Sequence, residues 1–169
     1  IGRWDPVKGI HVLVEAVRRI DRAVAIELTV HGLPGDQPYE RQVRSAAAGD
    51  PRIVFAPALP REAVLQALSG FDLLAVPSQW LETGPLVVLE SFAAGTPVIG
   101  SALGGIRELV TDGVDGVLVP AGDTRAWSAA LTNLARDRAS ALRAKVTRPR
   151  TADAVARDMH AIYADLLSR

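Results

Sequence analysis

The sequence has no cysteine, few aromatic residues and no excess of charge of either sign. Without cysteine, the chain cannot form disulfide bonds or metal sites built on thiolates. Aromatic residues make up 5% of the chain, so it offers no stacking platform for single-stranded nucleic acid. Lys and Arg together number 19, as do Asp and Glu. This balance argues against binding a nucleic-acid backbone, but it leaves room for a small local anion site.

Long apolar runs are also missing. No stretch comes near the roughly 18 consecutive apolar residues of a transmembrane helix, so we expect no membrane-spanning segment. The 169 residues, 49% apolar and 22% charged, suit one domain with a full hydrophobic core. We therefore expect residues 1–169 to form a single domain.

Patterns typical of helices and strands alternate along the chain. Short apolar strands separated by helices predict an α/β fold, a Rossmann-like doubly wound parallel sheet with helices on both faces. The predicted strands are 26–30, 53–55, 73–76, 98–99 and 117–119, and the predicted helices are 8–20, 39–48, 60–68, 85–94, 104–110, 123–134, 136–146 and 151–167.

Charged residues and glycines gather just after the predicted strands. In doubly wound sheets, ligands bind beyond the carboxyl ends of the strands, so these positions predict a ligand site. They are Arg3 and Lys8 after the chain start, His31 and Gly32 at the end of the next strand, 56–59 after the third and 78–84 after the fourth. For His31 itself we expect a structural hydrogen bond at the strand end.

Two glutamates, Glu82 and Glu90, stand in the most informative stretch. Glu82 lies in a loop, whereas Glu90 lies inside an almost wholly apolar helical run. A carboxylate in such a run costs free energy unless a polar group meets it, and a ligand hydroxyl is one candidate partner. Two plainer interpretations stay open: Glu82 is an acid near a helix start, and Glu90 lies on the one wet edge of its helix.

The helix that begins at Gly84 and Pro85 is a candidate anion site. The first amides of a helix lack intrahelical partners and carry positive potential, which suits phosphate. Gly84 leaves the backbone open to a ligand, and Pro85 fits the first helical position, although a plain helix start has the same pattern. Arg3 and Lys8 supply a planar fork and a mobile charge for phosphate, or are ordinary surface residues.

Several other chemistries lack their motifs. There is no G-x-G-x-x-G after the first strand, no Asp-x-Asp and no G-x-S-x-G. The glycine-rich stretch 98–105 lacks the Lys-Ser/Thr of a P-loop and indicates a tight turn from strand to helix. The histidines His11, His31 and His160 are scattered, so no metal site is expected.

The ordered motifs of the first 125 residues resemble a known family. They are similar to the C-terminal, donor-binding domain of the retaining glycosyltransferases of family 4 (group 1), whose full members have the two-domain GT-B fold. The matching pieces are residues 2–3, 8–9, 28–32, 71–78, 82–84, 89–98, 104–108, 112–113, 116 and 118–123.

The resemblance implies a role for each matched position. Arg3 and Lys8 would bind the diphosphate of a nucleotide sugar, Glu90 the ribose hydroxyls, and Glu82 the donor sugar. Retaining members are thought to react on one face of the sugar, with the leaving phosphate helping to take the acceptor proton. On that view, Glu82 and Glu90 do not act as a general acid and a nucleophile, as the two carboxylates of a retaining glycosidase do. The rest of the implied pocket comprises the amides and side chains around Gly84, Pro85, Leu86 and Val87, with Gly32, Ala58 and Leu59.

The resemblance also implies a cellular setting, and the sequence departs from the family pattern at two places. We expect a metal-independent hexosyltransferase in the cytoplasm, with contact to the inner membrane face through an acceptor domain and no nucleic-acid partner. Where members have Gly-x-Gly after the second strand, this chain has Leu33 and Pro34 after Gly32. It also has Pro57 where a glycine is common. These departures concern base preference and pocket width.

The chain start falls where a central strand would end. We therefore expect a truncated first strand and a gap in the sheet, a shifted strand or a neighbour filling in. As a half of a GT-B enzyme, residues 1–169 would lack the N-terminal acceptor domain, toward which the helix in 151–169 would cross, with its apolar side here exposed or packed against a neighbouring molecule. Alone, the chain would bind a donor without transferring sugar.

Three functions remain open at this stage. The first is the donor half of a retaining glycosyltransferase. The second is half of a related GT-B nucleotide-sugar epimerase, against which the context of Glu82 and Glu90 argues. The third is a non-catalytic nucleotide-sugar-binding module, against which the joint presence of Arg3, Lys8, Glu82 and Glu90 argues. The base, the sugar, the acceptor and the oligomeric state do not follow from the sequence.

Overall fold

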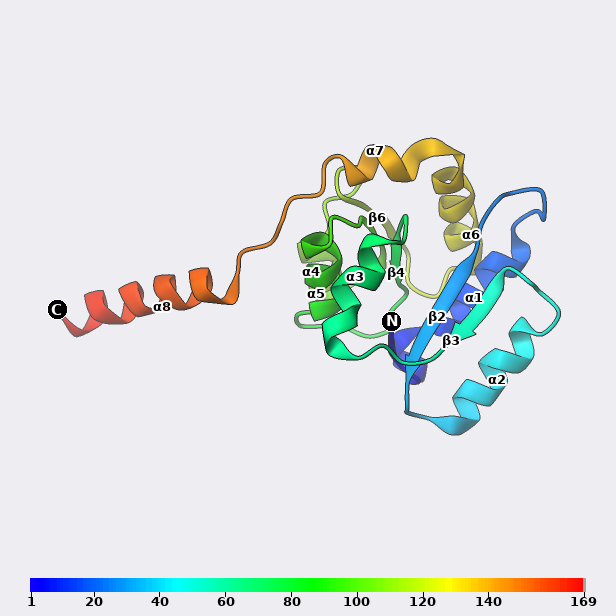
Figure 1. The fold of residues 1–169 in the computed structure, drawn as a ribbon, viewed down its shortest axis with the longest axis horizontal. Coiled ribbons are helices and arrows are strands. Elements are labelled where there is room, and N and C mark those ends of the chain that lie inside the picture. The colour runs from blue at the N-terminus through cyan, green and yellow to red at the C-terminus, as the bar shows by residue number, and fades with distance from the viewer. Residues whose placement is uncertain (169) are drawn as a thin grey trace.

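Helices and parallel strands alternate along the chain (Figure 1). The structure is a computed structural model that describes residues 1–168, apart from the side chains of 137 and 138. The strands are β1 Gly2–Arg3, β2 Leu28–Leu33, β3 Ile53–Ala56, β4 Leu74–Val76, β5 Val98–Ser101 and β6 Gly116–Val119. The α-helices are α1 Ile10–Arg19, α2 Gln37–Ala47, α3 Val64–Ser69, α4 Leu86–Ala93, α5 Gly104–Leu109, α6 Thr124–Asn133, α7 Ala139–Arg143 and α8 Ala152–Leu167.

The predicted α/β architecture is confirmed, with differences at the ends of elements. The helix predicted over 136–146 is shorter, because α6 continues through a π-helical stretch, Leu134–Arg138, before α7 begins. The helix predicted over 60–68 opens with a 3₁₀ turn at Arg61–Ala63. Both differences are local changes in backbone hydrogen bonding, to a 3₁₀ turn at a helix start and to a π-helical stretch between two helices.

The sheet is divided into two halves. One half has the strand order β1-β2-β3 and the other β4-β5-β6, and every pairing is parallel. β1 pairs only with the end of β2, where Gly2 lies opposite Gly32 and Arg3 opposite Leu33. Within residues 1–168, the edge of β2 that faces β1 is therefore unpaired over residues 28–31. No strand in this range connects β1 to β4 by hydrogen bonds. The expected gap in the sheet is observed at this point.

The two halves are held together by helices and by shared core packing. α1 packs against both α2 and α6. The first core cluster contains Ile99 of β5 and Val119 of β6 together with residues of α1, β2 and α6. Trp127 of α6 is fully buried in this cluster. A second cluster of buried residues lies between β4, β5 and the helices α3, α4 and α5.

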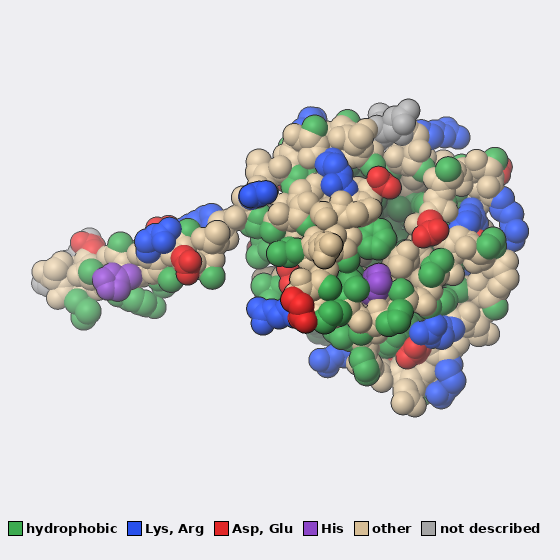
Figure 2. All heavy atoms as spheres, in the orientation of Figure 1, with side chains coloured by type: hydrophobic (Ala, Val, Ile, Leu, Met, Phe, Trp, Pro, Cys, Tyr) green, Lys and Arg blue, Asp and Glu red, His purple; other side chains and the backbone are tan. Residues whose placement is uncertain are grey.

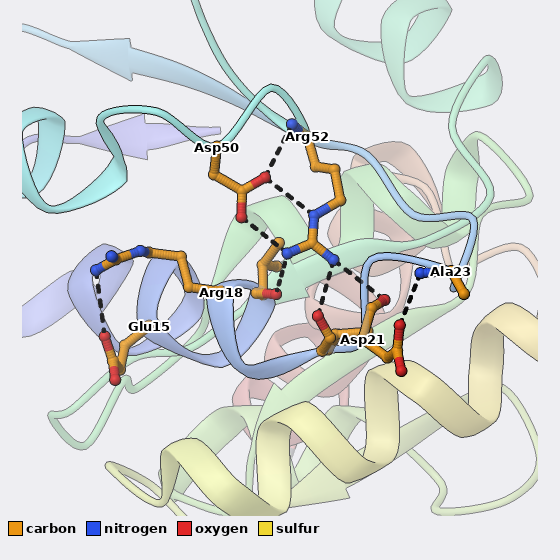
Figure 3. A network of polar contacts seen from close by, with 8 residues as sticks. Glu15, Arg18, Asp21, Ala23, Asp50 and Arg52 are labelled. Atoms are coloured by element: carbon orange, nitrogen blue, oxygen red, sulfur yellow. Dashed lines mark hydrogen bonds and ion pairs between the residues drawn. The ribbon is translucent and has the colours of Figure 1, made fainter.

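A partly buried arginine, Arg52, ties the end of α1 to the start of β3 (Figure 3). Arg52 donates to the carbonyls of Val17 and Ile20, each at 3.0 Å, at the end of α1. It also donates to both carboxylate oxygens of Asp50, at 3.0 and 2.8 Å. Hydrogen bonding from Arg52 lowers the pKa of Asp50 to about 2.

Helix α8 projects away from the rest of the molecule (Figure 1). None of its residues is buried, and Thr151 caps its first turn. Its exposed apolar residues recur at helical spacing, and Figure 2 shows hydrophobic side chains along the projecting helix. They include Val155, Met159, Ile162, Tyr163, Leu166 and Leu167. The expectation of an exposed apolar side is confirmed. None of the described helices is both long and apolar enough to cross a bilayer.

Candidate functional site

A cavity of about 620 Å³ lies between β2 and β4, at the divide of the sheet. Residues 27–31 of one half and 73–78 of the other line it, and it extends past the carboxyl ends of both strands. The space alongside residues 27–31 and 73–77 is the gap in the sheet, whereas the part beyond the carboxyl ends of the strands is where a ligand is expected in a doubly wound fold. The cavity brings together the predicted site residues Arg3, Lys8, Glu82, Gly84, Pro85, Leu86 and Val87.

Lys8 is positioned by a capped turn that begins just after β1. The Asp5 carboxylate accepts a hydrogen bond from the Val7 amide at 2.9 Å and so caps the 3₁₀ turn Pro6–Lys8. Gly9 ends the turn with φ of 68°, in the left-handed region that glycine favours. A side chain at Gly9 would collide with the carbonyl oxygen of Pro77. The loops that follow β1 and β4 are therefore in direct backbone contact.

The Glu82 carboxylate is held through one of its two oxygens. Lys8 donates from Nζ to Oε1 at 2.6 Å, and Ser78 donates from Oγ to the same oxygen at 2.9 Å. The backbone is held as well, because the amide of Gly105 donates to the Glu82 carbonyl at 2.6 Å. Side chain and main chain of Glu82 are thus fixed by separate donors.

The start of α4 opens into the cavity. Pro85 is the N-cap residue, one position earlier than the first helical position predicted from the sequence. No side chain caps the start of this helix in the described part of the chain, so the amides of Leu86 and Val87 have no side-chain acceptor. A side chain at Gly84 would meet no atom within 4 Å, which leaves this approach open.

Glu90 lies on α4 outside the lining of the cavity. It follows Leu86 by four residues, so both belong to the same face of the helix. Its side chain is half-buried, and among the described residues it has no hydrogen-bond or ion-pair partner. The polar partner expected for this carboxylate is therefore not another part of residues 1–168.

Positive charge collects on one side of the cavity. Arg3 lines it and has no ion-pair partner within residues 1–168, while Lys8 lies nearby on the following turn. The positive end of the α4 dipole adds to this potential. An anion in the cavity would therefore face Arg3, Lys8 and the α4 start together.

Gly32 does not line this cavity, and its expected place at the nucleotide pocket stays a prediction. It lines a smaller cavity of about 400 Å³ beside Trp4, Arg44 and Phe55. A side chain at Gly32 would collide with the Trp4 ring, which explains why glycine is needed there. The Arg44 guanidinium lies over the rings of both Trp4 and Phe55, at 5.4 and 4.6 Å from their centroids. Close packing accounts for Gly32.

The loop after β3 also stays out of the main cavity. Ala58 and Leu59 do not line it, because the loop runs over the surface from Pro57. His31 does line the cavity, and its Nδ1 lies 2.8 Å from the Pro57 carbonyl oxygen, the structural hydrogen bond that was predicted. Residues 1–168 contain no group of three or more His, Asp or Glu side chains arranged to hold a metal.

Ser78 and Gly105 are the contributors that sequence reasoning passed over. Both stand in stretches that carry the family resemblance, at 71–78 and 104–108. Their contacts with Glu82 depend on the fold, since Gly105 is brought to Glu82 only when α5 packs beside α4. The glycine-rich stretch 98–105 forms the predicted turn, and that turn supports the loop of Glu82.

Known proteins resemble this chain over most of its length. The family model described as "Glycosyl transferases group 1" matches residues 1–137. A D-inositol 3-phosphate glycosyltransferase from Nocardia farcinica is 34% identical over 146 residues, covering 82% of this chain and 32% of the relative. The chain therefore spans about a third of the length of this relative.

Solved structures agree on the fold. A sucrose-phosphate synthase from Thermosynechococcus elongatus superposes with a TM-score of 0.79 at 30% identity, over 99% of this chain and 44% of that one. Anabaena HepE, solved in complex with UDP-glucose, superposes with a TM-score of 0.70 at 22% identity, over 86% of this chain and 42% of that one. At that identity the second likeness concerns the fold alone.

Proposed function

Because the chain belongs to the group 1 glycosyltransferase family, we propose that it is the donor-binding part of a retaining glycosyltransferase. In this proposal it binds a nucleoside diphosphate sugar in the part of the cavity beyond the strand ends, between Arg3, Lys8, Glu82 and the start of α4, and the whole protein transfers a hexose to an acceptor. One observation carries the proposal. The cavity brings together Arg3, the mobile Lys8 and the uncapped start of α4 with the fixed carboxylate of Glu82.

The cationic side of the cavity suits the diphosphate. Arg3 can meet phosphate oxygens with its planar fork, and Lys8 can follow them on a flexible stem. The amides of Leu86 and Val87 add donors at the positive end of α4. These groups also stabilise the charge that grows on the diphosphate as it leaves, and that electrostatic role needs no metal in this proposal.

The two glutamates bind hydroxyl groups in this proposal. Glu82 accepts a hydrogen bond from the donor sugar and orients its anomeric carbon, while Glu90 accepts from the ribose. During transfer, the bond from the anomeric carbon to the phosphate oxygen breaks and a bond to the acceptor oxygen forms on the same face. The acceptor proton passes to the departing phosphate. Glu82 and Glu90 then serve binding and orientation rather than forming a glycosyl-enzyme intermediate.

The proposal extends to setting and partner. Nucleotide sugars are made in the cytoplasm, so we place the protein there, with contact to the inner membrane face through an acceptor domain of a longer protein. The exposed apolar side of α8 is the surface that such a domain would cover.

Titration of the chain with UDP, GDP and ADP tests the proposed function. We expect one of the three nucleotides to bind, and UDP is the first to try because Anabaena HepE was solved with UDP-glucose. Arg3→Ala should weaken that nucleotide about tenfold through the loss of a charge-assisted contact. The matched control is Arg61→Ala, an exposed arginine outside the cavity, which should change nothing. Failure of all three nucleotides to bind would refute the proposal.

A further inference from the structure

Two donors meet on a single oxygen of Glu82. Oε1 accepts from Lys8 Nζ at 2.6 Å and from Ser78 Oγ at 2.9 Å. The other carboxylate oxygen, Oε2, has no partner among the residues that the structure describes. A carboxylate can accept on both oxygens, so this arrangement leaves one acceptor for a ligand.

The two donors differ in how firmly they can hold the carboxylate. Ser78 is 1% exposed and lies two residues past the end of β4. Only one rotatable bond separates its hydroxyl from the backbone. The Lys8 side chain is 38% exposed and hangs on a flexible four-carbon stem. Ser78 is therefore the rigid donor and Lys8 the mobile one.

We propose that Ser78 is a positioning residue that fixes Oε1 of Glu82 and thereby presents Oε2 to a hydroxyl of the donor sugar. This inference rests on the proposed function. Lys8 is then free to turn toward the diphosphate, because the Ser78 hydroxyl keeps the carboxylate in place when the lysine moves. Ser78 thus decouples recognition of the sugar from recognition of the phosphates.

A matched control separates this role from a general effect of removing a buried hydroxyl. Ser91 is also fully buried, lies in the same half of the molecule, and donates to the Thr96 carbonyl at 2.8 Å. It does not line the cavity. Ser78→Ala and Ser91→Ala each delete one hydroxyl and one hydrogen bond, so a thermal melt of both variants shows whether the fold is kept.

The first experiment needs no ligand. Crystal structures of the chain and of Ser78→Ala should show the Glu82 carboxylate turned away from its original position in the variant alone. An unchanged Glu82 carboxylate in Ser78→Ala would overturn the proposal, whatever the chain binds.

The second experiment compares UDP, GDP and ADP with their glucose esters by calorimetry. For the base that binds, Ser78→Ala should weaken the glucose ester about tenfold and leave the free nucleotide within about twofold. Ser91→Ala should change neither, and adding Ser78→Ala to Glu82→Gln should have no further effect. Equal weakening of nucleotide and ester would overturn the role of Ser78 alone. Binding of no nucleotide would instead refute the proposed function, while the crystal structures still decide the role of Ser78.

Discussion

Gly105 donates its amide hydrogen to the carbonyl oxygen of Glu82 at 2.6 Å. The contact joins the first turn of α5 to the loop that carries the candidate sugar-binding carboxylate. A side chain at Gly105 would come within 2.9 Å of that oxygen and 3.1 Å of Pro85. The absence of a side chain at this position thus sets where the Glu82 backbone lies.

Gly105→Ala should displace the Glu82 loop and weaken the site. The added methyl group has to push backbone atoms aside, and overpacking of this kind costs about 1–3 kcal/mol of folding stability. Urea unfolding measures that cost, and calorimetry should show weaker binding of the glucose ester. Gly70→Ala is the matched control, because the nearest atom to a side chain there is the Ala67 carbonyl oxygen, at 3.4 Å. Equal behaviour of the two variants would contradict the supporting role of Gly105.

Glu90→Ala should weaken a nucleoside diphosphate more than inorganic pyrophosphate. The reason is that Glu90 lacks a protein partner in residues 1–168 and is assigned to the ribose hydroxyls, which pyrophosphate does not have. A loss of about tenfold for the nucleotide is expected from one hydrogen bond to a charged group. Glu62→Ala, at an exposed position outside the cavity, serves as the control. Equal weakening of both ligands would refute the ribose assignment.

Asp50→Asn should lower folding stability at neutral pH and lose this effect in acid. The pKa of Asp50 is depressed to about 2 in the folded chain, below its ordinary value of 3.8. Its ionised form therefore adds stability above about pH 4, and this contribution disappears as the pH falls from about 4 to 2.

Urea unfolding of the Asp50→Asn variant at several pH values measures this contribution. We expect a deficit of about 1–2 kcal/mol at pH 7 that shrinks toward zero near pH 2. Glu15→Gln removes an ion pair with Arg18 and Arg19 whose side chains are largely exposed, and it should cost about 0.5 kcal/mol or less. A deficit that stays constant from pH 7 to pH 2 would show that the Asp50 charge contributes nothing.

Removal of α8 should leave the stability of the rest unchanged. No residue of α8 is buried. The Arg150 side chain donates to the Ala154 carbonyl and to the Asp158 carboxylate, both within α8. A chain ending at Arg150 should melt within about 2 °C of the full chain, because little apolar burial is lost. Ending the chain at residue 138 is the contrasting variant. It removes buried Leu142 and the hydrogen bond from Arg143 to the Phe71 carbonyl, and should melt much lower.

Strands and helices could be predicted where the residues themselves carry the signal. The apolar run before Pro77 reads as a buried strand because its side chains must avoid water, and β4 lies within it. The start of α4 was predicted within one residue, since Pro85 restricts its own φ and lacks an amide hydrogen. The division of the sheet follows the short β1, which reaches only Gly32 and Leu33 of β2.

Residues whose role depends on a distant neighbour escaped prediction. Gly32 reads as a pocket residue in sequence, but its lack of a side chain makes room for the Trp4 ring, a contact that only folding reveals. Ser78 reads as part of a strand end, and its aim at Glu82 depends on the path of the loop between them. Such roles require three-dimensional proximity, which neither periodicity nor spacing contains.

The divided sheet places the site between the two halves of the sheet, which share one hydrophobic core. Arg3 and Lys8 belong to one half and Glu82 to the other, and contacts such as the Gln79 amide to the Val7 carbonyl at 2.7 Å span the seam. A ligand that holds Arg3 at one end and Glu82 at the other acts as a cross-link between the halves. Its binding should reduce the motion of the two halves relative to each other. A ligand bound by one half alone would not reduce that motion.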